Sequence, residues 1–324
     1  MYRRCLGRIF ATLIGVWLAA FVWSVPAFAV GDYFLEPDQV APGVYVFWGA
    51  QEPQTPDNGA RIANDGFIVG NNAVLIIDSG PNRRYGDQMF EAVTSVTDRP
   101  IRHAVITHHH FDHAFGLTAF SERGIEVVMH AGAAPYLVSE GAQILDLMTG
   151  LIGPEWTAGT TIGAPTRTIT ASEKIDLGGR LITIAAFGGG HTAGDIVILD
   201  HATGTLFAGD LVFNERPSTV PHADIDTWLG QLDVLIDWDW QRLIPGHGPL
   251  VTDAGPLRAA QAYLTFLQSQ TACSFRQGDS SVEALMVDIP PQHQTLAMIE
   301  VEFQRALFQL FRKYEASGPP PCDR

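Results

Sequence analysis

The run THHHFDH at positions 107–113 concentrates four imidazoles and one carboxylate in a single short segment. A short apolar stretch precedes it and is typical of a buried strand. Side chains two positions apart at a strand end point the same way, so His108 and His110 can hold one metal ion together. Asp112 and His113 follow where the chain turns, and they can face a second ion. Histidine and carboxylate ligands around an open position are what a catalytic zinc site needs.

Three later segments offer further ligands. The sequence reads GGGHTAGD at 188–195, FAGD at 207–210 and PGHG at 245–248, so that His191, Asp210 and His247 each follow or end a strand-like run. The glycines allow the backbone to approach closely beside each presented side chain. A single histidine of this kind is more often structural. Together, and in this order after THHHFDH, they supply enough ligands for two ions.

The elements that must position these residues occur in two similar successions of strands and helices. Strands are expected at 44–48, 66–69, 73–77, 103–106 and 126–129, and again at 167–170, 174–177, 181–187, 196–199, 204–208 and 242–245. Helices are expected at 85–96, 112–120, 132–150 and 223–237, and from 253 onward with breaks near Gly278 and Pro290. This mixture favours an α/β fold in which two sheets pack on each other with helices outside.

The N-terminus has the pattern of an export signal. Three arginines at 3, 4 and 8 precede an apolar run at 9–23, and Ala27-Phe28-Ala29 has the form of a cleavage site. The apolar run is shorter than the roughly 20 residues that a membrane-spanning helix requires. We therefore expect residues 1–29 to be a removed signal peptide, by the general or the twin-arginine route. The mature protein is expected to be periplasmic or secreted, without a stable membrane span; the alternative is an uncleaved anchor.

The charge of the chain excludes one class of partner. It carries 35 acidic and 20 basic residues, a formal net charge of −15, and removal of the signal would make this about −18. A nucleic-acid backbone would be repelled, so we expect a small-molecule substrate and no nucleic acid.

Two of the three cysteines, Cys273 and Cys322, remain after signal removal. An even number in an oxidising compartment is consistent with a disulfide, which would tie the proline-rich tail to a C-terminal helix. Two unlinked thiols are the alternative, because the sequence does not give their separation in space.

From Gly43 to Pro249 the chain resembles the metallo-β-lactamase superfamily, on the motifs HxHxDH, GHTxGD, a strand-end aspartate and GHG. The resemblance implies an αββα sandwich at 30–252, followed by a C-terminal helical extension at 253–324 packed on it. It also implies two zinc ions at one edge between the sheets. The first would take His108, His110 and His191, the second would take Asp112, His113 and His247, and Asp210 would bridge the two.

Asp210 separates branches of this family, because zinc β-lactamases usually have Cys or Ser at that position. A bridging aspartate resembles the glyoxalase-type thioesterases and other broad hydrolases. The segments IIDSGP at 76–81, RRYG at 83–86 and FAGDLVF at 207–213 resemble the quinoprotein relay system zinc metallohydrolases. That likeness implies an association with periplasmic quinoprotein dehydrogenases that use pyrroloquinoline quinone.

The expected chemistry is hydrolysis of a small ester, thioester or lactam-type substrate. Two zinc ions can bind one water, lower its pKa to about 7 and polarise the carbonyl that the hydroxide attacks. Asp112 is expected to act as a ligand and as the catalytic group that orients the hydroxide and transfers its proton. Iron is a second option for the same ligands and would favour an oxygenase acting on sulfur compounds. A non-catalytic periplasmic partner of a dehydrogenase is the third.

Three further residues are assigned to the surroundings of the metals. His109 should point away from the ions, into a supporting or structural position. His222 could line the substrate mouth or be a structural loop residue. Asp78 is expected to cap a turn, with a hydrogen bond to a metal-binding histidine as the alternative. Substrate choice is expected to lie in the loops at 49–62, 132–166 and 213–223.

Overall fold

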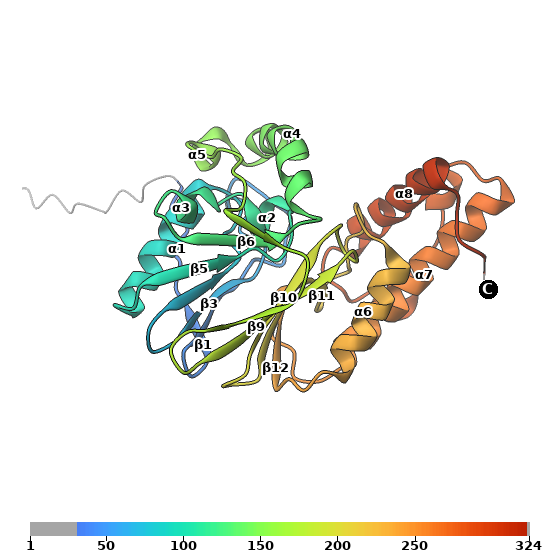
Figure 1. The fold of residues 1–324 in the computed structure, drawn as a ribbon. Coiled ribbons are helices and arrows are strands. Elements are labelled where there is room, and N and C mark those ends of the chain that lie inside the picture. Colours follow the sequence, from blue (N-terminus) through green and yellow to red (C-terminus); the bar gives the residue numbers. More distant parts are fainter. Residues whose placement is uncertain (1–30, 323–324) are drawn as a thin grey trace, which may run out of the picture.

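The computed structural model describes residues 31–322, so the expected signal peptide at 1–29 lies outside the described residues. Two β-sheets pack face to face in the middle of the molecule, and helices cover the outer side of each sheet (Figure 1). The fold class expected from the sequence, an αββα sandwich with a C-terminal helical region, is confirmed. No helix within residues 31–322 is both long enough and apolar enough to cross a bilayer.

The first sheet has seven strands that follow one another in sequence order. They are β1 (Asp38–Ala41), β2 (Val44–Phe47), β3 (Asp65–Val69), β4 (Val74–Ile77), β5 (Ile101–Val105), β6 (Glu126–His130) and β7 (Arg167–Ile169). The strands from β1 to β4 are antiparallel, whereas β4 to β7 run parallel. Parallel strands need crossover connections, which place helices on the outer face.

The second sheet has five strands in the order β12-β11-β10-β9-β8. They are β8 (Glu173–Asp176), β9 (Leu181–Gly188), β10 (Asp195–Asp200), β11 (Thr205–Phe213) and β12 (Arg242–His247). All neighbours are antiparallel except β11 and β12. The crossover between these two contains helix α6.

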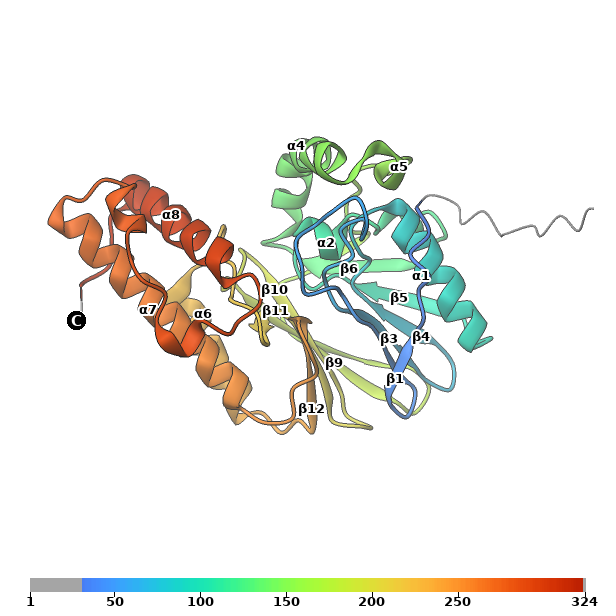
Figure 2. The same ribbon diagram turned by 180° about the vertical axis from the view of Figure 1, so that it is seen from behind.

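The helices fall into two groups, on opposite sides of the paired sheets (Figures 1 and 2). Those on the first sheet are α1 (Arg83–Val96), α2 (Phe111–Ala114), α3 (Thr118–Ser121), α4 (Ala134–Ile152) and α5 (Pro154–Thr157). Those on the second are α6 (Ile225–Asp237), α7 (Gly255–Gln277) and α8 (Ile299–Ser317), with short turns η1 (Glu283–Leu285) and η2 (Pro291–His293). Asn82 begins α1 by accepting a hydrogen bond from the Tyr85 amide, and Asp224 begins α6 in the same way.

The alternation of apolar residues explains why the sheets are buried on both faces. Along β4, Val74 and Ile76 pack under the helices of the first sheet, whereas Leu75 and Ile77 pack between the two sheets. Successive strand side chains point to opposite faces, so a strand buried on both faces is apolar throughout. In β10, Val197 likewise faces α6 and α7 while its neighbours face the other sheet.

One expected element is divided. The helix expected at 112–120 is two single turns, α2 and α3, because the chain passes too close to the preceding loop at Gly116. A β-carbon there would lie 2.0 Å from the Ser79 carbonyl oxygen, and the Gly116 amide donates to the Gly80 carbonyl. The interruption holds the loop after β4 against the segment that carries the histidines.

Helices α7 and α8 pack on each other and on α6, with their apolar faces in the core of the second sheet. A disulfide joins Cys273 near the end of α7 to Cys322, with a Cα–Cα distance of 4.9 Å. The pairing that the sequence left open is therefore present, and it ties the proline-rich tail to α7. Arg276 also donates hydrogen bonds to the carbonyls of Pro319 and Pro320.

Candidate metal centre

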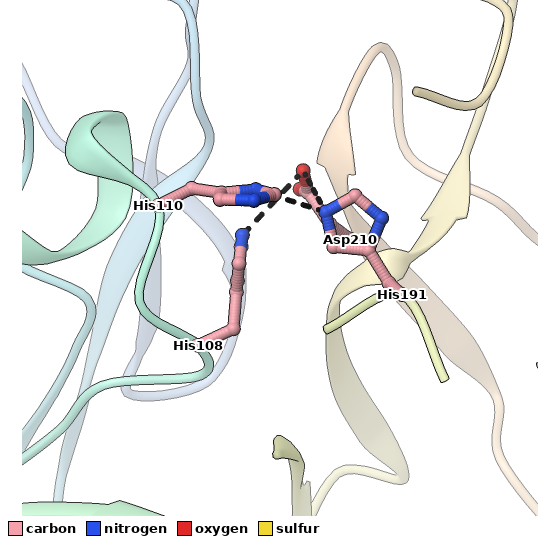
Figure 3. Close-up of side chains that lie close together, drawn as sticks. All are labelled: His108, His110, His191 and Asp210. Atoms are coloured by element: carbon pink, nitrogen blue, oxygen red, sulfur yellow. Dashed lines mark hydrogen bonds and ion pairs between the residues drawn. The ribbon is translucent and has the colours of Figure 1, made fainter. Parts of the chain in front are cut away.

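The seven residues singled out as metal ligands lie at one edge of the sandwich, where strands from both sheets end. The loop after β5 carries His108 and His110, helix α2 carries Asp112 and His113, and the turn before β10 carries His191. Strands β11 and β12 carry Asp210 and His247. Figure 3 shows the first-sheet histidines meeting His191 and Asp210 from the second sheet. All are buried or nearly so, which keeps solvent from competing for their polar atoms.

The first group contains His108, His110, His191 and Asp210, whose potential ligand atoms all lie within 4.8 Å of one another. The Nε2 atom of His108 lies 3.7 Å from Oδ2 of Asp210, and Nε2 of His191 lies 3.3 Å from the same oxygen. Nδ1 of His110 is 3.0 Å from Nε2 of His191. These atoms surround one small space.

The second group contains Asp112, His113 and His247. Nε2 of His247 lies 3.4 Å from Oδ2 of Asp112 and 3.4 Å from Oδ2 of Asp210. Nε2 of His113 lies 3.1 Å from the other oxygen of Asp210, Oδ1. The Asp210 carboxylate therefore stands between the two groups, with an oxygen available to each.

The residues fit a metal centre by their unsatisfied atoms. Nε2 of His108, Nε2 of His113 and Oδ1 of Asp210 are buried and make no regular hydrogen bond in the described structure. Nε2 of His113 and Oδ1 of Asp210 only face each other, at 3.1 Å. Buried polar atoms are normally paired, so a cluster of them converging on one space indicates a missing ligand. Imidazole nitrogens and carboxylate oxygens are ligands for zinc and for other transition metals.

The charge states also suit cations. Burial lowers the pKa of His108 and of His110 well below the usual range, and neighbouring histidines lower it further, so both rings are neutral and can donate a lone pair. Burial alone would raise the pKa of Asp210, but the surrounding histidines His247, His113 and His108 hold it well below its usual range. Asp210 is thus an anion among neutral or cationic rings.

Asp78 makes the hydrogen bond to a proposed metal-binding histidine that was the alternative role expected for it from the sequence. Its Oδ2 lies 2.9 Å from Nδ1 of His113, and it accepts hydrogen bonds from the Thr107 amide and hydroxyl. An acceptor on Nδ1 fixes the tautomer of His113 and turns Nε2 toward Asp210. Asp78 also adopts a positive φ of 60°, so it does occupy a turn.

His247 is oriented by residues that the sequence analysis did not identify. Its Nδ1 lies 2.7 Å from the Ile62 carbonyl, which leaves Nε2 for the metal side. Asn64 donates hydrogen bonds to the carbonyls of Pro245 and Gly248 and so fixes the PGHG turn. Asn64 is 181 positions from Pro245, so no sequence pattern could have indicated this contact.

His109 and His222 lie beside His110 of the first group. Nδ1 of His222 is 2.9 Å from Nε2 of His110, and its Nε2 is 3.2 Å from Glu140 on α4. The His109 ring packs against Tyr136 and His222. His109, His110 and His222 also form a third close group of potential ligands. His222 is 26% exposed, so it reaches the opening of the site.

A pocket of about 300 Å³ opens onto the second group and Asp210. All three loops expected to choose the substrate contribute to it. Helix α8 contributes as well, which the sequence did not indicate. The lining residues are Gln54, Ile62, His110, Phe111, Asp112, Ile144, Leu147, Met148, Asp210, Arg216, Thr219, Pro221, His222, His247, Glu302, Arg305 and Gln309.

Comparison with known proteins identifies the family of this chain. The sequence profile of the Metallo-beta-lactamase superfamily matches residues 58–259. The chain belongs to this superfamily, and it is a metal-dependent hydrolase.

The individual related proteins are only distantly similar to this chain in sequence. Human acyl-coenzyme A thioesterase MBLAC2 is 27% identical over 224 residues, which cover 62% of this chain and 77% of that protein. The probable metallo-hydrolase YqjP of Bacillus subtilis is 26% identical over 229 residues, which cover 59% of this chain and 69% of that protein. A solved metallo-beta-lactamase from Pontibacter korlensis matches 71% of this chain and 99% of its own, with a TM-score of 0.58 and 20% identity. That likeness shows the fold.

Proposed function

We propose that this protein is a di-zinc hydrolase of a small ester or thioester. The observation that carries the proposal is the position of Asp210, with its carboxylate oxygens within 3.1–3.7 Å of a histidine nitrogen in each ligand group. His108, His110 and His191 would hold one ion, and Asp112, His113 and His247 would hold the other. Asp210 would bridge them.

Bound zinc would ionise a water molecule near neutral pH and polarise the carbonyl group of the substrate. The chain itself supplies orientation and proton handling. Asp112 lines the pocket, and its Oδ2 lies close to both His113 and His247, so it can hold and release a proton beside the reacting carbonyl. Ile144, Leu147 and Met148 on α4 give the pocket an apolar wall for an acyl or alcohol portion.

The choice of a thioester or ester over a lactam is supported by two facts. The residue between the two ligand groups is an aspartate, as in the thioesterase-type members that the sequence resembles. A relative that matches most of the fold is an acyl-coenzyme A thioesterase. A lactam remains in the substrate panel below as a comparison.

We further propose that the protein is exported and acts beside periplasmic quinoprotein dehydrogenases. The disulfide between Cys273 and Cys322 supports an oxidising compartment. The motifs that resemble the quinoprotein relay system zinc metallohydrolases support the association. Mass spectrometry of protein from the native host should find a chain that begins near Val30, and a chain that retains residues 1–29 in the cytoplasm contradicts export. Co-purification with a quinoprotein dehydrogenase tests the association. If no such dehydrogenase is crosslinked to this protein in the periplasm, the association is contradicted.

The central experiment combines elemental analysis with a substrate panel of thioesters, simple esters and a chromogenic cephalosporin. We expect about two zinc ions per chain, with turnover of a thioester or ester and little turnover of the cephalosporin. Iron in place of zinc, with no hydrolysis of any compound, would replace the proposal by an oxygenase acting on sulfur compounds. A metal-free protein without turnover would indicate a non-catalytic partner.

A further inference from the structure

Both ring nitrogens of His110 face another histidine. Nδ1 lies 3.0 Å from Nε2 of His191, where the first ligand group converges (Figure 3), and Nε2 lies 2.9 Å from Nδ1 of His222. A histidine binds a metal through the lone pair of a ring nitrogen, and a neutral ring carries its one proton on the other nitrogen. His110 can therefore bind an ion beside His191 through Nδ1 only when its proton is on Nε2, facing His222.

His222 can accept a hydrogen bond from that proton because Glu140 occupies its other side. Nε2 of His222 lies 3.2 Å from Oε2 of Glu140 on α4, and both side chains are partly buried. An ionised carboxylate only accepts hydrogen bonds, so it draws the ring proton of His222 to Nε2. Nδ1 of His222 then presents a lone pair, which accepts from the Nε2–H of His110.

This arrangement replaces a support that other histidines of the centre receive directly. His113 and His247 each turn Nδ1 to a carboxylate or carbonyl oxygen and leave Nε2 for the metal side. Within residues 31–322, Nε2 of His110 has no such oxygen as a partner, and it faces His222 instead. A histidine that is oriented by a carboxylate takes the place of the oxygen.

We propose that Glu140 and His222 are positioning residues for the first metal ion: Glu140 orients His222, and His222 accepts the Nε2 proton of His110 and leaves Nδ1 for the ion. The inference rests on the di-metal centre of the proposed function. It also connects that centre to the substrate pocket through α4. Ile144 lines the pocket and stands four positions after Glu140, on the same face of the helix.

The test is the zinc affinity of the mature protein, measured by competition with a chromophoric chelator, together with the number of zinc ions per chain. His222→Ala should weaken the binding of one ion by about 10–100-fold, as loss of a partner behind a ligating histidine does. His222→Asn should bind zinc more tightly than His222→Ala, because an amide oxygen can accept in place of Nδ1. Glu140→Ala should weaken binding by itself but add little to His222→Ala, because Glu140 acts through His222.

Nuclear magnetic resonance of the zinc-loaded protein with nitrogen-15-labelled histidine gives a second readout, which is independent of turnover. We expect His110 to carry an Nε2–H that exchanges slowly with water, and this N–H should exchange faster in His222→Ala. The controls are His201→Ala and Asp146→Ala, at an exposed histidine and an exposed acid of α4 that belong to neither ligand group and do not line the pocket. Both should bind zinc as the unmodified protein does.

Equal zinc affinity in the unmodified protein and in His222→Ala overturns this inference, as does a proton on Nδ1 of His110. Three zinc ions per chain, with one lost in His222→Ala, would make His109, His110 and His222 a third metal site and also overturn it. Additive losses in the double variant overturn the role of Glu140. If the unmodified protein binds no zinc, the di-metal centre itself fails, and the proposed function fails with it.

Discussion

At the scale of single residues, the centre depends on a few polar atoms placed by partners distant in sequence. Asp210 can approach the turn that carries His247 because Gly246 has no side chain; a β-carbon there would lie 1.9 Å from Asp210 Oδ1. Asp78 and Ile62 each accept from the Nδ1 side of a histidine and leave Nε2 for the ions. These contacts predict how particular substitutions will behave.

Replacing Asp112 by Asn should lower turnover at least about 100-fold, the range associated with loss of a positioned acid–base group. The amide keeps the shape of the side chain but cannot accept and release the proton. Steady-state kinetics on the best substrate of the panel is the measurement, with metal content and circular dichroism recorded for the same sample. The exposed Asp237→Asn is the matched control. Normal turnover in Asp112→Asn would exclude this role.

Replacing Asp78 by Asn should weaken metal binding at the second group by about 10–100-fold, which is typical for loss of a carboxylate behind a ligating histidine. The amide oxygen can still accept from the Thr107 amide, so the turn after β4 should persist. Competition with a chromophoric chelator measures the affinity. If the affinity is unchanged, Asp78 serves only the turn.

At the scale of elements, one ion pair fixes an end of the second sheet, and one disulfide ties the C-terminal tail to α7. Arg180 pairs with Asp200 at 2.6 Å, where β10 ends, and donates to the Val69 carbonyl on β3 of the other sheet. The Asp200 side chain is fully buried. Burial tends to raise the pKa of Asp200, but Arg180 and Thr203 outweigh it and lower the pKa below the usual value.

This direction gives a pH dependence. Because the pKa of Asp200 is lower in the folded state, its contribution to stability is complete above the unfolded pKa of about 3.9 and is lost as the pH falls below it. Asp200→Asn should therefore lower the free energy of unfolding by about 3 kcal/mol at pH 7, a loss typical of a broken buried pair. The difference from the unmodified protein should narrow below about pH 4. Urea unfolding at pH 7 and pH 3.5 measures both, with the exposed Asp146→Asn as control. If the difference in unfolding free energy between the two proteins does not change with pH, a lowered pKa of Asp200 in the folded state is contradicted.

The disulfide closes a loop with a sequence separation of 49 residues and should stabilise the C-terminal helices by about 2–4 kcal/mol. Cys322→Ser removes the bond at a half-buried position in the tail and leaves the buried Cys273 in place. Urea unfolding with and without reductant measures the effect. The unmodified protein should lose stability on reduction and the variant should not respond. Equal midpoints for oxidised and reduced protein would rule out this contribution.

At the scale of the whole molecule, the metal centre joins the two sheets. Ligands from the first sheet meet ligands from the second across their common edge (Figure 3), so bound ions should hold the halves of the sandwich together. Ions that bind only the folded state stabilise it by mass action, by about 4 kcal/mol at 1,000 times Kd.

Removal of the metals by a chelator should therefore lower the melting temperature by several degrees, and addition of zinc should restore it. Differential scanning calorimetry measures both steps. Magnesium is the control, because it prefers oxygen ligands and should not restore the transition. A melting temperature that is unaffected by chelation and by zinc would show that the buried polar cluster does not hold ions.

Much of the fold was predictable because local sequence patterns indicate the positions of its strands and helices. Short apolar runs located the strands that carry or precede the ligands, such as β5 and β11, and periodicity located α1, α4 and α6. The helix expected at 112–120 was wrong as a single element, since its interruption comes from the contact between Gly116 and the loop after β4. That contact is tertiary, so residue periodicity contained no signal for it.

The sequence by itself determined which residue types lie in or beside the strands and in what order, because those follow from local spacing. The strand expected to end before Asp210 continues to Phe213, so Asp210 lies inside β11 and not at its end. Only the tertiary structure decided that Asp210 lies between the two ligand groups, that Cys273 meets Cys322, and that α8 reaches the pocket through Glu302, Arg305 and Gln309. The physical reason is that these proximities depend on how two sheets and a terminal pair of helices pack. Packing is set by the whole apolar core, not by the residues that it brings together.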